Sequence, residues 1–163
     1  MEKFRSIILS TSIIFGCCNA QEKVMNTAPA TIKHPQLRVA RPVSDITRTQ
    51  LMYCKGLNFR VLATFKDHDG FDGVMLGHPG VQYHFEFTHC HKQEIVPNST
   101  PEDLIVLYFP NETEWKITCS NMISAGFKEI KSFNPYWDVR GRTFQDTDGY
   151  RVVLQHAEWK IDN

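Results

Sequence analysis

Residues 133–154 read FNPYWDVRGRTFQDTDGYRVVL, and this stretch decides the fold. A glycine-containing turn at residues 139–142 joins two strand-forming runs, and an acidic turn at residues 146–149 precedes a strand of alternating character. We therefore expect two neighbouring strands whose paired side chains face one concave surface.

Outward from this stretch, the chain contains two copies of one unit, each in the order βαβββ. The first module spans about residues 36–91 and the second about 103–158, within one domain at 35–160. The expected strands lie near residues 37–41, 59–65, 73–76 and 81–89, then 104–109, 128–133, 142–144 and 150–156.

Each module also carries one predicted helix. The first begins after Ser44 as N-cap and ends at Gly56, and the second begins at Asn111, with Glu114 in a capping-box position, and ends at Gly126. One helix covers only one face of a small sheet, so the uncovered faces of the two modules must find another partner. The sequence thus predicts an α+β fold in which two βαβββ modules form a curved, eight-stranded half-barrel with the helices outside.

The repeated motifs resemble those of a known superfamily. They are the segments LRVARP at residues 37–42, DHDGFDG at 67–73 and YHFEF at 83–87, together with the stretch quoted above. This chain is similar to the vicinal oxygen chelate superfamily, which includes glyoxalase I, extradiol dioxygenases, and fosfomycin and bleomycin resistance proteins, and within it to the YycE-like branch. The resemblance implies that ligands bind in the cleft that the sheets enclose.

Composition narrows the classes of partner. The chain has 163 residues, enough for one ordinary core, and its 18 basic side chains balance 18 acidic ones. Without a basic excess or a Lys/Arg-rich run, a nucleic-acid partner is not expected. We expect a small organic molecule as partner, and leave open whether the protein forms a homodimer.

The amino terminus resembles an export signal. Lys3 and Arg5 precede an apolar run at residues 7–18, which is shorter than the roughly 20 residues that span a bilayer as a helix. Residues 1–20 are therefore a predicted signal peptide or lipoprotein leader, and residues 21–34 a linker. We expect an exported protein, periplasmic or membrane-anchored.

Two ways of processing this leader stay open. Small side chains at residues 18–20 fit cleavage after Ala20, whereas residues 14–17 resemble a lipobox in which Cys17 would be lipidated. A lipid on Cys17 would be the protein's one link to a membrane. A third alternative is an uncleaved extension on a cytosolic protein.

Strand alternation places a polar face toward the cleft. In residues 83–88, the three aromatic side chains share the face that should pack on the helix, while His84, Glu86 and Thr88 share the other. A carboxylate between an imidazole and a hydroxyl could hold a metal, move a proton or bind a polar ligand. The alternative is an ordinary half-exposed sheet surface.

The resemblance also implies where a metal would sit. Glu86 matches the metal-binding carboxylate of glyoxalase-like proteins, but the matched positions for the other ligands are Arg38, about Leu104, and Val153, none of which is a normal ligand. We therefore expect no metal and no other cofactor. We expect Arg38 to pair with Glu86 in the space that a cation would have filled.

Other residues complete the predicted ligand site. Tyr136 and Trp137 could close over a planar ligand at the rim or pack in the core, and Tyr108 and Gln155 share strand faces with the matched positions. The predicted ligand-binding set is Arg38, His84, Glu86, Tyr108, Tyr136, Trp137 and Gln155.

Two functions are consistent with this site. The first is metal-free binding of a small organic molecule, as in bleomycin-resistance-type proteins. The alternative is an enzyme, a glyoxalase-like lyase, isomerase or dioxygenase, that uses a displaced metal site or acid–base chemistry by Glu86 and His84.

Overall fold

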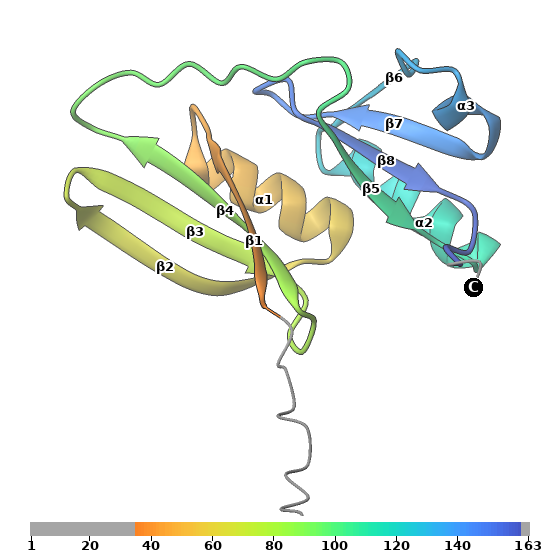
Figure 1. Cartoon of the computed structure of the whole chain (residues 1–163), viewed down its shortest axis with the longest axis horizontal. Coiled ribbons are helices and arrows are strands. Elements are labelled where there is room, and N and C mark those ends of the chain that lie inside the picture. Colours follow the sequence, from red (N-terminus) through yellow and green to blue (C-terminus); the bar gives the residue numbers. More distant parts are fainter. Residues whose placement is uncertain (1–34, 161–163) are drawn as a thin grey trace, which may run out of the picture. The chain divides into compact units, whose positions relative to one another are not determined.

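The structure, a computed structural model, describes residues 35–160 (Figure 1). The predicted leader at residues 1–20 with its lipidation candidate Cys17, and the predicted linker at 21–34, lie outside the described residues. Within residues 35–160, no helix has the length and apolar character needed to cross a membrane.

The described chain folds into two modules, each with a four-stranded sheet. The first module contains β1 (Leu37–Pro42), α1 (Ile46–Leu57), β2 (Arg60–His68), β3 (Phe71–Gly77) and β4 (Tyr83–Cys90). The second contains β5 (Leu104–Tyr108), α2 (Glu112–Ser124), β6 (Lys128–Ile130), α3 (Tyr136–Arg140), β7 (Gly141–Gln145) and β8 (Arg151–Gln155).

The strand order is the same in both sheets, β1-β4-β3-β2 and β5-β8-β7-β6. The first strand of each module runs parallel to the last, and the other neighbours are antiparallel. The predicted α+β fold with two βαβββ modules is therefore confirmed, and the sheets are not closed into a barrel, as a curved half-barrel requires.

The ends of α1 differ from the prediction. The N-cap is Asp45, whose side chain accepts a hydrogen bond from the Arg48 amide at 2.9 Å, because Ser44 bonds elsewhere in the fold. The C-cap is Asn58 in the left-handed conformation, with φ of 56°. Gly56 has a packing role instead, since a Cβ there would lie 2.7 Å from the Met122 sulfur of α2.

The ends of α2 agree with the prediction. Asn111 is the N-cap, and its side chain accepts a hydrogen bond from the Glu114 amide at 3.0 Å. After the C-cap, Gly126 adopts φ of 95°, which favours glycine.

The two helices and the sheet faces toward them share one core. Tyr53 of α1 is fully buried in it, with its ring centroid 4.7 Å from that of Phe87 and 5.2 Å from that of Phe127. The core therefore spans both modules, and rings from β4 and from the segment after α2 meet on one side chain of α1.

Hydrogen bonds between the modules lie beside this core. The Tyr53 hydroxyl donates to Asp146 Oδ2 at 3.0 Å, and the Tyr150 hydroxyl donates to the Pro42 carbonyl at 3.0 Å. Burial raises the pKa of the Asp146 carboxyl, while the hydrogen bond from Tyr53 acts in the opposite direction. The acidic turn predicted at residues 146–149 thus also joins the modules.

The strand predicted at residues 128–133 is shorter than expected, and a short helix, α3, takes up part of the turn predicted at residues 139–142. The strand β6 stops at Ile130, and residues 131–135 lead into α3. The Asp138 carboxylate accepts a hydrogen bond from the Ser132 amide at 3.1 Å, which fixes the segment before the helix. The extra helix has no counterpart in the first module.

Candidate functional site

Three of the predicted site residues form a polar cluster on neighbouring strands. Arg38 of β1 lies opposite His84 of β4 in the parallel register. Arg38 Nη1 donates to Glu86 Oε2 at 2.6 Å, and Arg38 Nε donates to His84 Nε2 at 2.8 Å. We call Arg38, His84 and Glu86 the polar triad.

Strand alternation positions the triad. Phe85 and Phe87, on the opposite face of β4, are buried against the helix side, with Phe87 beside Tyr53. Because successive side chains on a strand alternate, His84 and Glu86 face away from this core. The two faces of β4 are therefore sorted as the sequence predicts.

The triad is unevenly buried. The Glu86 side chain is 12% exposed, whereas the Arg38 side chain is 49% exposed. The guanidinium of Arg38 therefore balances a largely buried carboxylate while part of it stays in contact with water.

Hydrogen bonding also determines the tautomer of the neutral His84 ring. Its Nε2 accepts from Arg38, so the proton of the neutral ring is on Nδ1. That Nδ1 is buried, and no hydrogen-bond partner for it lies among the described residues. An acceptor from outside these residues could satisfy it.

The residues of the triad do not fit the metal that the fold family implies. Zinc sites take three or four protein ligands, with a water or substrate in any open position. In residues 35–160, no three side chains of His, Cys, Asp or Glu converge in this way. In addition, Arg38 brings a positive charge within hydrogen-bond distance of the one carboxylate.

The other predicted site residues form separate groups on the second module. The Tyr108 ring packs on Trp159 with centroids 5.5 Å apart, and the Tyr136 and Trp137 rings meet edge to face at 4.9 Å. Tyr136 is 60% exposed. No hydrogen bond or ring contact within residues 35–160 joins these groups to the polar triad.

Gln155 is the most buried of the predicted ligand residues. It is 3% exposed and lies between its strand partners Tyr108 and Gly141. Its Oε1 is buried and has no hydrogen-bond partner in the described part of the chain. A Cβ on Gly141 would contact both Gln155 Oε1 and the Trp137 carbonyl, so the chain of α3 lies close beside this side chain.

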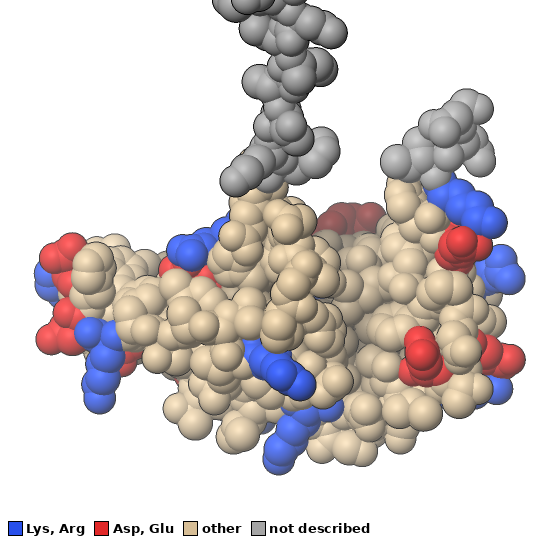
Figure 2. Space-filling view, turned by 90° about the horizontal axis from the view of Figure 1, so that it is seen from below, with Lys and Arg blue, Asp and Glu red and all other residues tan. Residues whose placement is uncertain are grey.

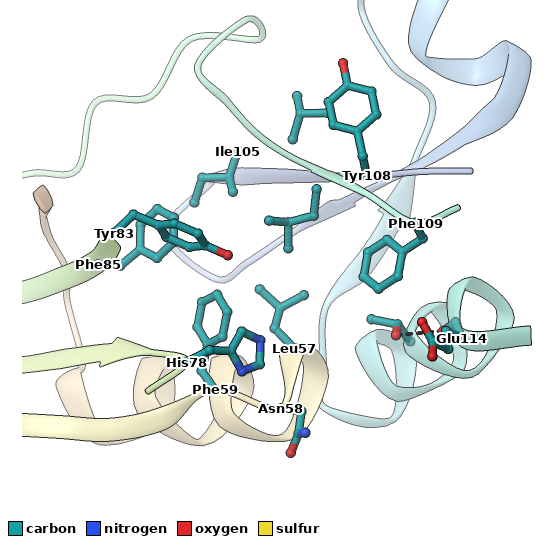
Figure 3. A pocket seen from close by; sticks show the side chains of 13 residues that line it. Leu57, Asn58, Phe59, His78, Tyr83, Phe85, Ile105, Tyr108, Phe109 and Glu114 are labelled. Carbon is teal, nitrogen blue, oxygen red and sulfur yellow. Dashed lines mark hydrogen bonds between the residues drawn. The ribbon is translucent and has the colours of Figure 1, made fainter. Parts of the chain in front are cut away.

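A cavity of about 570 Å³ lies elsewhere, between the helix-facing sides of the two modules (Figure 3). Among the predicted residues, only Tyr108 lines it, and its ring points away from the cavity. The apolar wall comes from both modules and consists of Leu57, Phe59, Phe85, Ile105, Leu107 and Phe109. Sequence reasoning missed this cavity because these residues have the pattern of ordinary core positions.

Sequence profiles match both modules. The profile of the YycE-like N-terminal domain matches residues 37–88, and that of the YycE-like C-terminal domain matches residues 102–156. The chain belongs to the YycE-like family. Uncharacterized protein YycE of Bacillus subtilis (strain 168) is 37% identical over 123 residues, which cover 76% of this chain and 88% of that protein.

Solved structures of relatives share the fold. The crystal structure of B. subtilis YycE has a TM-score of 0.73 at 34% identity, covering 80% of this chain and 96% of that chain. Leishmania major glyoxalase I, described as trypanothione-dependent, has a TM-score of 0.59 at 18% identity, covering 76% and 86%. TnmS3, an antibiotic binding protein from Streptomyces sp. CB03234, has a TM-score of 0.54 at 19% identity, covering 77% and 96%. The chain thus has the fold of glyoxalase-like proteins, and its YycE relative is itself described as a putative glyoxalase/fosfomycin resistance protein.

Proposed function

We propose that this YycE-like protein binds a small organic molecule at the polar triad without a metal. The observation that supports the proposal is the Arg38–Glu86 ion pair at 2.6 Å. By the sequence resemblance, Glu86 corresponds to the carboxylate with which glyoxalase-like proteins hold an ion. The arginine supplies the positive charge that the carboxylate needs, so a bound cation is not required for charge balance.

The triad offers both donors and acceptors to such a ligand. Arg38 uses Nε and Nη1 within the triad, and Nη2 keeps its two N–H groups for another partner. Glu86 Oε1 has no hydrogen bond from the described residues, and His84 Nδ1 lacks an acceptor there. Because the charges of Arg38 and Glu86 cancel, a neutral polar ligand suits this surface best.

The geometry favours binding over acid–base catalysis. Arg38 contacts His84 Nε2 and Glu86 Oε2 at once. A base must be able to accept a proton from the substrate, and here the arginine occupies one acceptor of each group. Base catalysis by His84 Nε2 would require Arg38 to move, and the guanidinium charge beside Glu86 makes that carboxylate a weaker base. The fold of TnmS3, an antibiotic binding protein, is compatible with a binding role.

The decisive experiment combines metal analysis with ligand detection. We expect purified protein to contain no stoichiometric metal, and its native mass spectrum to show a retained small molecule or to gain one from a metabolite extract. Arg38→Ala should abolish that mass increment, while Lys116→Ala, a surface change on α2, should preserve it. A stoichiometric ion bound with submicromolar affinity and lost in Glu86→Gln would overturn the proposal.

A further inference from the structure

The cavity between the modules is separate from the polar triad. Its lining includes none of Arg38, His84 and Glu86, and it uses the face of β4 that carries Phe85. Its volume of about 570 Å³ lies within the range of small-molecule sites, roughly 300–1,000 Å³. Ligand binding in this cavity therefore does not depend on ligand binding at the polar triad, which is the proposed function.

Aromatic rings shape one side of this cavity. Phe59 and Phe85 stack with centroids 5.7 Å apart and an interplanar angle of 14°. The His78 ring stands edge-on to Phe59 at 5.2 Å, and both His78 and the Tyr83 hydroxyl point into the cavity (Figure 3). Flat walls of this kind favour a planar ring over a branched aliphatic group.

A free strand edge forms the other side. β5 is the edge strand of its sheet, and residues 105–109 all line the cavity. The Phe109 amide bonds β8 through the Gln155 carbonyl, so by alternation the backbone groups of Val106 and Tyr108 point away from β8. These two residues therefore present backbone N–H and C=O groups at the cavity wall, even though the Tyr108 ring points elsewhere.

The charged side chain that lines the cavity is acidic. Glu114 is the only carboxylate in the lining, and no Lys or Arg lines the cavity. The Glu114 amide donates to the N-cap Asn111, but within residues 35–160 the Glu114 carboxylate forms no salt bridge, whereas Glu112 on the same helix pairs with Lys116 at 2.7 Å. The face seen from below is largely uncharged, with basic and acidic side chains scattered over it (Figure 2). A carboxylate beside an apolar cavity attracts a cation and repels an anion.

We propose that this cavity binds a planar aromatic amine, with the ring between Phe59, Tyr83 and Phe109 and the ammonium group near Glu114. The ammonium has three N–H donors, and the free-edge carbonyls of β5 provide acceptors in addition to the carboxylate. An aromatic carboxylate of the same size would face Glu114 without a compensating cation. The flat aromatic rings of the apolar wall therefore select a planar ring, and the single acidic side chain selects a positive charge.

The test uses tryptamine and indole-3-acetate, which share a ring and differ in charge. We expect tryptamine to bind with 1:1 stoichiometry in titration calorimetry, more tightly than indole-3-acetate. Amide shifts in NMR should concentrate at residues 57–59, 78–85 and 105–109. Glu114→Gln should weaken tryptamine binding about threefold to fivefold, because an exposed ion pair contributes at most about 1 kcal/mol. Glu112→Gln is the matched control and should change nothing.

A second pair of variants tests the location. Thr118, on α2, lines the cavity, and Thr118→Trp should fill it and abolish binding, while Ile117→Trp, at an exposed neighbour outside the lining, should not. Arg38→Ala should leave tryptamine binding unchanged, which separates this site from the polar triad. Equal binding of the two probes, amide shifts outside the cavity, or a dimer that covers the cavity and excludes tryptamine would each overturn the proposal. The shift map of the unaltered protein decides the location even if Thr118→Trp fails to fold.

Discussion

The two modules share a strand order but differ in how the second and third strands of each are joined (Figure 1). In the first module β2 and β3 are joined by Asp69 and Gly70 alone, with φ of 53° and 89°. Such a pair is typical of a tight hairpin turn. In the second module, residues 131–140 lie between β6 and β7 and include α3.

This difference decides what each sheet can expose. On the face of the second sheet away from the core helices, Thr143 is 1%, Val153 0% and Gln155 3% exposed. The matching face of the first sheet carries the polar triad, where the Arg38 side chain is 49% exposed. These three side chains are buried and uncharged, whereas the matching face of the first sheet is open and carries the charged triad.

The two modules have the same strand order, but one sheet face contributes buried surface that stabilises the fold and the other carries the proposed binding site. A charged cluster is tolerated on the open face because water solvates part of Arg38. The same cluster under α3 would pay a much larger desolvation cost. The second module therefore supplies buried surface, and the first keeps a polar surface available.

The largest expected effect tests whether α3 truly covers the second sheet. In Gly141→Ala the new Cβ would lie 2.4 Å from Gln155 Oε1 and 2.6 Å from the Trp137 carbonyl oxygen. Because a backbone oxygen cannot easily move aside, we expect a loss of about 2–3 kcal/mol in unfolding free energy, measured by urea denaturation.

The matched control is Gly77→Ala in the first module. Its Cβ would lie 3.3 Å from Leu62 Cδ1 and 3.4 Å from His84 Cβ, so a flexible side chain can adjust. We expect a change below about 1 kcal/mol. Equal losses of unfolding free energy in the two variants would show that α3 does not cover the second sheet more closely than the first sheet is covered.

Local sequence patterns predicted most of the fold. Alternation in residues 83–88 sorted the two faces of β4, and the cap at Asn111 was identified from residue type alone. Both depend on neighbours within a few residues, which is where propensity is informative. The Arg38–Glu86 pair was predicted in another way, by matching both strands to the metal-ligand positions that the family resemblance implies.

Long-range contacts account for what the sequence did not predict. Ser44 resembles an N-cap, but its hydroxyl donates to Asp148 Oδ1 at 2.6 Å, across the two modules. The five-residue helix α3 is too short to form by propensity alone. The cavity at the helix side depends on how the modules pack, which no local pattern reports.

The next effect concerns the open face of the first module. Arg38→Ala leaves the Glu86 carboxylate, 12% exposed, without its cation, and should cost about 2 kcal/mol. Glu86→Ala leaves a half-exposed arginine that water can solvate, and should cost about 1 kcal/mol. The double variant should lose less than the sum, with a coupling of about 1 kcal/mol in thermal and urea unfolding. Strictly additive losses would show that Arg38 and Glu86 do not stabilise each other.

A smaller effect tests the bond between the modules. Tyr53→Phe removes the buried hydrogen bond to Asp146 and should cost about 1 kcal/mol at neutral pH. Burial raises the folded-state pKa of Asp146 above its usual 3.8, so its contribution to stability is present below pH 3.8 and falls as pH rises through the folded pKa. Loss of the tyrosine hydroxyl should raise that pKa further.

The difference between Tyr53→Phe and the unaltered protein should therefore be larger at pH 7 than at pH 3. Tyr150→Phe provides the control, because its hydroxyl donates to the uncharged Pro42 carbonyl and its loss should depend less on pH. Urea denaturation at both pH values measures the two differences. A Tyr53→Phe loss that is greater at pH 3 would show that Asp146 is not the titrating partner.

The smallest effect compares one surface carboxylate with its hydrogen-bond donor in each module. In the second, Arg142 Nε donates to Glu129 Oε1 at 2.6 Å and lowers the pKa of Glu129 below its usual 4.5. In the first, the hydrogen bond from His91 lowers the pKa of Asp72 below its usual 3.8. A lowered folded-state pKa means that the stabilisation is present above the unfolded value and is lost as pH falls through the folded one.

Glu129→Gln should therefore cost about 0.5 kcal/mol at pH 7, since both partners are about one-third exposed, and its deficit should shrink as pH falls below about 4.5. The Asp72→Asn deficit should persist to lower pH and shrink below 3.8. Thermal unfolding from pH 7 to pH 2.5 measures both series. A deficit that grows on acidification would contradict the lowered pKa of the carboxyl in that pair.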